Sequence, residues 1–204
     1  MMNLMKKQIF LQENLLKKIV KFFFLFGFIF YCTNINAEEK WIIDKKISNI
    51  TFEVPVLFAT NVIGEFTDFD GFVEIDLENK ENNKAIISVQ INSIKINYEK
   101  YKDLILGPIF FNSNKYPIGV LDTKKFSYTD EVDLELNMEL NIKGKSKTIK
   151  TQININRLTK DLVQIIGHFS FNRNDFKIGE GSWENTTILK NSIEVKSNIF
   201  LVRE

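Results

Sequence analysis

Cysteine and histidine are almost absent from this chain of 204 residues, which holds one of each, Cys32 and His168. Cys32 lies in an N-terminal segment that we expect to be removed, so the remaining chain can form no disulfide and offers no thiolate ligand. With one histidine left, a metal site would have to use hard carboxylate ligands. No Asp-rich calcium loop is present either. We therefore predict no metal, no cofactor and no thiol chemistry.

His168 is also the one histidine that could act as a general base. No sequence motif ties it to a serine or a carboxylate, as nucleophilic catalysis would require. The alternation of its strand puts Gly167 and Phe169 on the inner face, so His168 is expected to point outward. We predict that the protein is not an enzyme. A secreted enzyme on a barrel scaffold stays as an alternative, which loss of an activity in a His168→Ala variant would support.

A long apolar run is missing as well. The longest stretch covers residues 22–32, whereas a membrane-spanning helix needs about 20 apolar residues. Lysines at positions 17, 18 and 21 precede this stretch, and Ala37 follows it just before a charged segment. This order is typical of a secretory signal peptide. We expect residues 1–37 to be the signal, residues 38–204 to be the mature domain, and the location to be periplasmic.

Neither sign of charge dominates the mature chain. Without residues 1–37 it carries 22 basic and 25 acidic residues, a net charge of about −3. Nucleic acids and anionic membrane surfaces are recognised by basic patches. The balance therefore predicts that nucleic acid is not a partner.

Apolar and polar residues alternate through most of residues 41–201. Leu134, Leu136 and Met138, for example, share one face of a strand, while Glu135 and Asn137 share the other, because side chains in a strand point alternately to opposite faces. We expect strands at 47–54, 62–77, 85–91, 119–122, 124–128, 132–142, 148–155, 162–172 and 192–201, a polar loop at 78–84, a turn at 143–145, and a short helical segment between 98 and 111.

A sheet with one apolar face can cover that face by closing into a barrel, which also removes its open edges. The predicted fold class is therefore all-β, an eight-stranded antiparallel barrel with a short helical segment near one mouth. The same alternation also fits an outer-membrane barrel, whose apolar residues face outward. That interpretation stays as a second alternative.

An eight-stranded barrel is just wide enough to be filled by side chains or to hold one small ligand. Twelve phenylalanines in the mature chain, and the room expected beside Gly64, Gly71, Gly119 and Gly167, favour a ligand. Arg173 follows an apolar strand, where it could pair with Asp175 or bind an anionic head group through two hydrogen bonds.

The order and spacing of these segments resemble the YceI-like proteins, a family of exported, lipocalin-like barrels that bind polyisoprenoid lipids. The matching segments are 41–44, 48–54, 62–66 followed by Phe69 and Gly71, 109–113 with Tyr116-Pro117, 140–144 and 171–176. The resemblance implies a barrel whose interior takes a long isoprenoid or other amphipathic chain, without catalysis. The chain departs from the family near Phe58 and Ala59, where members often carry a histidine, and at 101–105, where many have an Arg-Asp-x-His-Leu-like stretch. These departures put the head-group contacts in question.

We predict that the protein binds, transports or stores a polyisoprenoid or other long-chain amphipathic lipid, with that lipid as its ligand. Transient membrane contact for cargo exchange and a homodimer are left open as partners. The residues predicted to bind the lipid are Phe52, Val54, Phe66, Val89, Ile91, Phe110, Phe111, Leu136, Met138, Leu140, Phe169, Phe171, Arg173, Val195 and Ile199.

Overall fold

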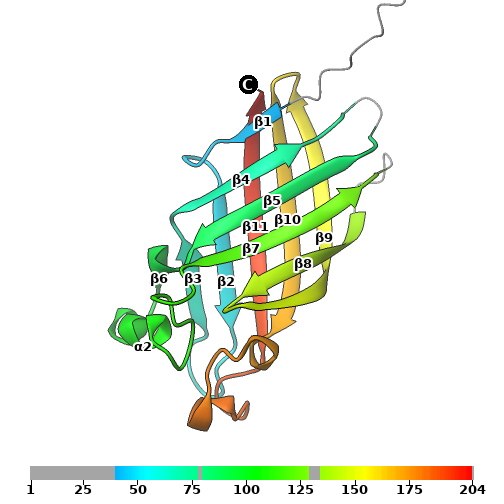
Figure 1. Ribbon diagram of the computed structural model, residues 1–204. Helices are drawn as coiled ribbons and strands as arrows, with labels where there is room; N and C mark the ends of the chain where they lie inside the picture. The colour runs from blue at the N-terminus through cyan, green and yellow to red at the C-terminus, as the bar shows by residue number, and fades with distance from the viewer. Residues whose placement is uncertain (1–39, 78–79, 129–133, 204) are drawn as a thin grey trace, which may run out of the picture. The chain divides into compact units, whose positions relative to one another are not determined.

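The alternating segments of the sequence form one antiparallel sheet (Figure 1). The computed structural model describes residues 40–77, 80–128 and 134–203. All of them belong to one compact unit, residues 38–204, and the predicted signal peptide lies outside them. The strands in the described part of the chain are β1 (Lys40–Ile43), β2 (Asn49–Val54), β3 (Val62–Phe66), β4 (Phe69–Glu74), β5 (Asn83–Gln90), β6 (Ile94–Ile96), β7 (Ile118–Phe126), β8 (Leu134–Ile142), β9 (Lys145–Thr159), β10 (Leu162–Asn172) and β11 (Ser192–Arg203).

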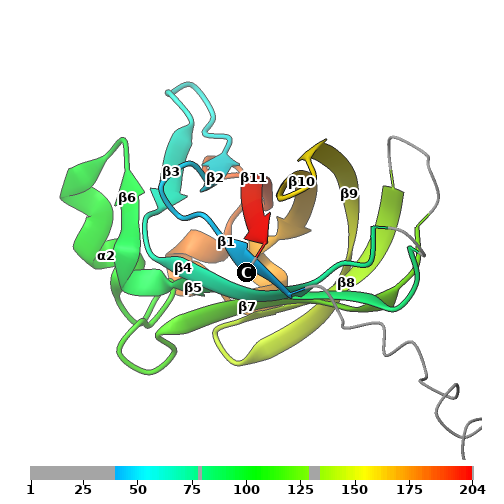
Figure 2. The same ribbon diagram turned by 90° about the horizontal axis from the view of Figure 1, so that it is seen from above.

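Eight of these segments close into a ring in the order β1-β4-β5-β7-β8-β9-β10-β11, because β1 also pairs with β11. Figure 2 shows this ring from above. The remaining three extend it, since β2 continues the pairing of β1 along β11, β3 pairs with β2, and β6 pairs with β3. Each of the pairs β1/β2, β3/β4 and β5/β6 is thus one bent strand. The predicted eight-stranded antiparallel barrel is confirmed.

Side-chain hydrogen bonds hold the bends in these strands. At the bend between β5 and β6, the Ser93 hydroxyl donates to the carbonyl of Gln90 at 2.7 Å and accepts the amide of Asp68 at 3.0 Å, which joins it to the bend between β3 and β4. At the bend between β1 and β2, the Ser48 hydroxyl accepts the amide of Phe200 at 2.8 Å. Serine fits here because its short hydroxyl can replace a ladder partner that the bend removes.

The short helical segment predicted between residues 98 and 111 is also present. It consists of the 3-10 turn η2 (Glu99–Tyr101) followed by helix α2 (Lys102–Leu106). Further 3-10 turns are η1 (Ile91–Ser93), η3 (Arg173–Phe176) and η4 (Gly181–Glu184). Among the described residues, no helix has the length and apolar character needed to cross a membrane.

One expected pair of strands is a single strand in the structure. Residues 119–122 and 124–128 were predicted as separate strands, but β7 runs through both with a bulge, where its register against β5 shifts. Lys124 sits in the bulge with a left-handed φ of 57°. Thr123 precedes the bulge and shares the inward face with Gly119 and Leu121, so it is buried, and its hydroxyl accepts the amide of Ala85 at 2.9 Å. A bulge interrupts the alternation by one residue, which explains the false break.

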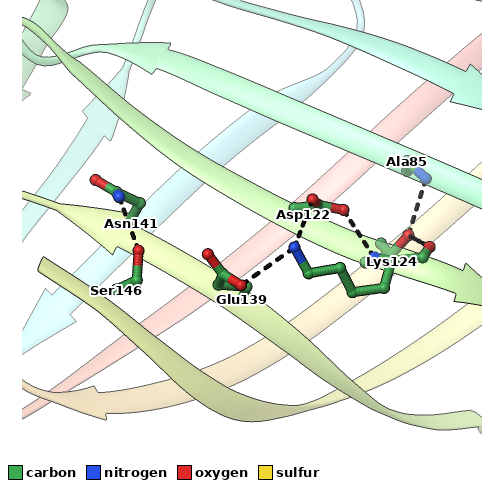
Figure 3. Close-up of polar contacts among 7 residues, drawn as sticks. Ala85, Asp122, Lys124, Glu139, Asn141 and Ser146 are labelled. Atoms are coloured by element: carbon green, nitrogen blue, oxygen red, sulfur yellow. Dashed lines mark hydrogen bonds and ion pairs between the residues drawn. The ribbon is translucent and has the colours of Figure 1, made fainter.

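The apolar faces of the strands are turned into the barrel. In β8, Met138 and Leu140 are buried, whereas Glu135 is exposed. Outward side chains form ion pairs, such as the one at 3.1 Å between the Lys124 ammonium on β7 and Glu139 on the neighbouring strand β8, while Lys124 also pairs with Asp122 on its own strand at 2.9 Å (Figure 3). An outer-membrane barrel needs the opposite arrangement. That alternative is therefore wrong for the described strands.

The half of the barrel that holds β1 is filled with side chains. Val163 and Leu201 are completely buried there, and the buried indole of Trp41 donates to the carbonyl of Ile75 at 3.2 Å. This packed half also includes Ile43, Val73, Leu136, Met138, Ile149 and Ile153. In an interior packed this closely, a change in the volume of even one side chain affects its neighbours.

Candidate functional site

The other half of the barrel, the hollow half, encloses a cavity of about 420 Å³. This volume lies within the range of small-molecule sites, about 300–1,000 Å³. Its lining comes from β2 and β3, from the second halves of β5, β8 and β10, and from the first halves of β7 and β11. In an antiparallel barrel these parts all lie at the same end. The lining residues are Ile50, Phe52, Val54, Val56, Ala59, Thr60, Val62, Phe66, Ile87, Val89, Ile91, Tyr98, Tyr101, Leu104, Ile105, Phe110, Phe111, Gly119, Val120, Leu121, Leu140, Ile142, Phe169, Phe171, Arg173, Ile178, Trp183, Ile188, Leu189, Ile193, Val195, Ser197 and Ile199.

Thirteen of the fifteen residues predicted to bind the ligand line this cavity. The two exceptions, Leu136 and Met138, are buried in the packed half. Alternation along a strand shows which side chains face inward, but it does not show how deep they lie along the barrel axis. For this reason the sequence predicts the inner face well and does not separate the hollow half from the packed half.

Several lining residues were not predicted. Val56, Leu104 and Ile105 come from segments between strands, and Trp183, Ile188 and Leu189 come from the long connection between β10 and β11. Their signal is a set of large apolar side chains in segments that lack strand alternation. Of these segments, only residues 98–111 were predicted from this signal, as a short helical segment near one mouth of the barrel.

Aromatic rings form much of the cavity wall. The rings of Phe52 and Phe66 lie with centroids 5.6 Å apart, and Phe110 meets Trp183 edge to face at 5.4 Å. Phe169 and Phe171 follow each other along β10 with centroids 6.4 Å apart. Such rings present large, rigid apolar surfaces to a ligand.

The four glycines expected to leave room beside the phenylalanines behave differently from one another. A Cβ at Gly64 would overlap the ring of Phe52, and one at Gly71 or Gly167 would come within 2.6 Å of a neighbouring side chain. The space at these three positions is therefore already occupied by protein. Gly119 alone among the four lines the cavity, and a Cβ there would come no closer than 3.2 Å, to a Val89 methyl group.

Arg173, at the inner end of the β10–β11 connection, is 1% exposed and uses all of its donors within the protein. Its guanidinium donates to the carbonyls of Lys190 (3.0 Å), Ile178 (3.0 Å), Leu189 (3.0 Å) and Asn185 (3.3 Å) and to the side-chain oxygen of Asn174 (3.0 Å). Burial lowers the pKa of Arg173 from its ordinary value. A longer contact joins Nη1 to the Gly179 carbonyl at 3.5 Å, so all five N–H groups of Arg173 have partners within the protein.

These contacts correct both roles suggested for Arg173. The guanidinium does not pair with Asp175, whose side chain is exposed, and it has no donor left for an anionic head group. Instead it shapes the connection between β10 and β11. Gly179 belongs to this arrangement, because its φ of +84° favours glycine and a Cβ would come 2.7 Å from the Arg173 Nη1 atom.

Lys143 joins three segments at the hollow end. Its side chain is only 7% exposed, and its ammonium donates to the carbonyls of Pro108 (3.0 Å) and Lys177 (2.7 Å) and to Glu180 Oε2 (2.8 Å). The hydrogen bond and charge of Lys143 lower the pKa of the Glu180 carboxyl. The β8–β9 turn is thereby tied to the segment after α2 and to the β10–β11 connection.

The cavity opens to solvent where these connections meet. Tyr101, Trp183 and Ile188 line it and are also 44%, 37% and 64% exposed. Ala59 and Thr60 line it and are exposed as well. We call this opening the rim and define it as residues 56–60, 98–105 and 183–189. In Figure 1 these segments lie toward the lower end of the barrel.

The chemistry of the lining is that of an apolar container. Of its residues, Thr60, Arg173 and Ser197 alone are polar or charged apart from the aromatic hydroxyls and indole, and none is a histidine, carboxylate, lysine or cysteine. His168 is exposed on the outside of β10, as predicted. Within the described ranges, no three side chains of His, Cys, Asp or Glu are grouped so that they could hold a metal ion.

Comparison with known proteins gives consistent matches over the barrel. Residues 41–201 match the YceI-like domain family. Protein YceI of Salmonella agona (strain SL483) is 25% identical over 133 residues, which are 64% of this chain and 70% of that protein. Alignments with two further curated relatives cover 62% and 55% of their lengths, so the chain spans less than two thirds of those proteins.

Solved structures show the same fold. The crystal structure of BcnA from Burkholderia cenocepacia matches with a TM-score of 0.71 at 19% identity, covering 78% of this chain and 98% of that one. A protein from Saccharophagus degradans, described as a polyisoprenoid binding domain implicated in plant cell wall breakdown, matches with a TM-score of 0.66 at 13% identity. That alignment covers 81% of this chain and 99% of the other.

Proposed function

Because this chain belongs to the YceI-like family, we propose that its barrel binds a polyisoprenoid or other long-chain amphipathic lipid without catalysing a reaction. The observation that carries the proposal is the cavity of about 420 Å³ with an almost entirely apolar lining. The similarity to a structure described as a polyisoprenoid binding domain supports the same class of ligand.

The energetics favour the apolar tail as the bound part. Burial of one CH₂ group contributes about 0.8 kcal/mol, so each five-carbon unit contributes roughly 3–4 kcal/mol before ordering costs. A few such units give tight binding with no polar contact. This is the type of binding that a lining of aliphatic and aromatic side chains provides.

The arrangement of the cavity also sets the orientation of the lipid. The packed half closes the inner end with apolar residues, so a head group placed there would lose its hydration without gaining partners. Arg173 has no free donor. We therefore place the tail inside and the head group at the rim, where the Thr60 side chain and solvent are available, and where the Tyr98 hydroxyl, which donates to the Thr60 carbonyl at 3.0 Å, can still accept a hydrogen bond.

The cellular role that follows is a carrier or buffer for such a lipid in the periplasm. It rests on residues 1–37 acting as a secretory signal, with cleavage after Ala37. Amino-terminal sequencing of the protein isolated from its native host tests this part. A mature chain that starts at Glu38 in the periplasmic fraction supports it, whereas an uncleaved chain in the cytoplasmic fraction contradicts it.

Native mass spectrometry of protein purified from its host, followed by lipid extraction, tests the binding function. We expect a mass added to the folded chain that disappears on extraction and is recovered as an isoprenoid-type or other long-chain lipid. A protein that is always empty, including after exposure to such lipids, would overturn the proposal.

A variant that fills the cavity sharpens this test. We expect Gly119→Leu to reduce the lipid content at least about fivefold, because Gly119 lines the cavity and the added side chain occupies part of it once the Val89 methyl group, 3.2 Å from the new Cβ, shifts by a few tenths of an ångström. The matched control is Leu136→Ala in the packed half, which should lower stability but leave the lipid content of the folded protein unchanged. Equal lipid content in both variants would contradict the assignment of the hollow half as the site.

A further inference from the structure

Phe58, in the connection between β2 and β3, is the most exposed large apolar side chain among the described residues, at 97%. Its backbone has a left-handed φ of 60°. For a bulky residue this conformation is unusual and strained. The chain thus holds a full phenylalanine ring in solvent, in a conformation that asparagine or glycine would adopt more easily. Packing within this protein does not explain the residue.

The surroundings of Phe58 are apolar and belong to the rim. Residues 55–64 contain no charged side chain, in a chain of which 26% is charged. The Leu57 amide donates to the Ile188 carbonyl at 2.9 Å, and the Lys190 amide donates to the Pro55 carbonyl at 3.0 Å. These bonds fix the loop of Phe58 next to Ile188, which is 64% exposed and lines the cavity.

Two aromatic residues complete this exposed surface. Tyr101 and Trp183 each have one side toward the cavity and another toward solvent. Tyrosine and tryptophan concentrate at the boundary between lipid and water, since they combine an apolar ring with a polar group. Exposed apolar side chains are thus found both at Phe58 and, through the neighbouring Ile188, in the lining of the cavity.

The charges around the rim balance each other. The rim holds two basic and three acidic residues, and together with the residues that flank it, in segments 55–64, 98–106 and 181–190, it holds three of each. A partner recognised by charge, such as an acidic protein or an anionic surface, would require an excess of one sign. A neutral rim with protruding apolar and aromatic residues is instead complementary to the interface of a zwitterionic bilayer.

We propose that the rim docks on a lipid bilayer by inserting Phe58 and Ile188, so that the cavity opens directly into the membrane. This inference rests on the proposed lipid-binding function and adds the surface through which the lipid enters and leaves. Direct entry keeps the apolar tail out of water during transfer. It also accounts for the strained exposure of Phe58, because the ring is buried only when the protein is docked.

Binding to phosphatidylcholine vesicles tests the proposal. It is measured by flotation at low salt and at about 1 M salt, because at about 1 M salt charge interactions are screened beyond about 3 Å. Phe58→Asn removes the ring and suits the left-handed backbone, so the fold should be kept. Phe72→Thr is the matched control, because Phe72 is 47% exposed on the outer face of β4, away from the rim. In parallel, each protein is loaded with geranylgeraniol added from detergent.

We expect the unmodified protein to bind vesicles at both salt concentrations, Phe58→Asn to bind about tenfold more weakly, and Phe72→Thr to bind normally. All three should take up geranylgeraniol. Equal vesicle binding by the unmodified protein and Phe58→Asn would overturn the docking surface. The same holds if the unmodified protein takes up geranylgeraniol but does not bind vesicles, or if its vesicle binding is lost at high salt. Failure of all three to take up geranylgeraniol would overturn the proposed function and this inference with it.

Discussion

Arg173 shows how one buried charge can be kept inside a protein without an ion-pair partner. Six oxygen acceptors surround its guanidinium, and five of them are backbone carbonyls of the connection between β10 and β11. A buried charge is tolerated when every donor is hydrogen-bonded. The residue therefore organises Ile178 and Leu189 around the cavity and does not act as a ligand itself.

Replacing Arg173 should consequently affect stability. We expect Arg173→Met to lower the free energy of unfolding by about 2–4 kcal/mol, because it leaves several buried carbonyls without donors. Arg173→Lys should recover only part of this loss, since lysine has three donors at a single point. Urea unfolding of lipid-free protein measures both. Lys196→Met, on the outer face of β11, serves as a control that should change stability by no more than about 0.5 kcal/mol. An equally small effect of Arg173→Met would contradict this role.

At the scale of single elements, the strand pattern was readable from the sequence wherever alternation is regular. The face of β8 that carries Met138 and Leu140 was predicted correctly, as was the outward direction of His168. The bulge at Lys124 was not predicted, because one extra residue looks the same as a break between two strands. The role of Arg173 was missed because its acceptors are backbone carbonyls, which every residue carries.

Ion pairs on the outer faces of the strands make stability depend on pH. Hydrogen bonds from Lys45 and Gly71 lower the pKa of Asp70 from its usual 3.8. For Asp122, partial burial acts to raise the pKa, but the hydrogen bonds and charge of Lys124 outweigh it and lower the pKa. A carboxyl whose pKa is lower in the folded than in the unfolded chain stabilises the fold at neutral pH. This contribution is lost as the pH falls through the folded-state pKa.

We therefore expect the free energy of unfolding to decrease between about pH 5 and pH 2, as the lowered carboxyls are protonated. The double variant Asp70→Asn and Asp122→Asn should be less stable than the unmodified protein at pH 7. Its free energy of unfolding should also fall less than that of the unmodified protein as the pH is lowered. Urea unfolding at a series of pH values gives both slopes. Identical slopes for the variant and the unmodified protein would show that these two carboxyls do not contribute.

At the scale of the whole described domain, the barrel interior is divided into a packed half and a hollow half. The sequence predicted the barrel and its inner face, because both follow from alternation and closure. It could not predict the division, since Leu136 and Leu140 have the same alternation and the same residue type. Leu140 borders the cavity and Leu136 does not, because the loops at the hollow end leave the barrel interior beside Leu140 unfilled.

The same Leu→Ala substitution, made once in the packed half and once in the hollow half, compares how much each half contributes to stability. Leu201 is completely buried in the packed half, whereas Leu140 is nearly as buried but faces the cavity. Leu→Ala changes in cores cost about 2–5 kcal/mol, depending on how many contacts are lost. In lipid-free protein, we expect Leu201→Ala to be the more destabilising by at least about 1 kcal/mol, because Leu140 already borders empty space. Calorimetric or urea unfolding measures the difference, and equal losses would argue against a hollow half.

The most direct measurement is a crystal structure of the protein purified from its native host. We predict continuous density for an apolar chain between Phe169, Leu140 and Val195, running out past Trp183 and Ile188, with its polar end outside. An interior in which the protein's own side chains close the space between these residues, with no density for another molecule, would contradict the account.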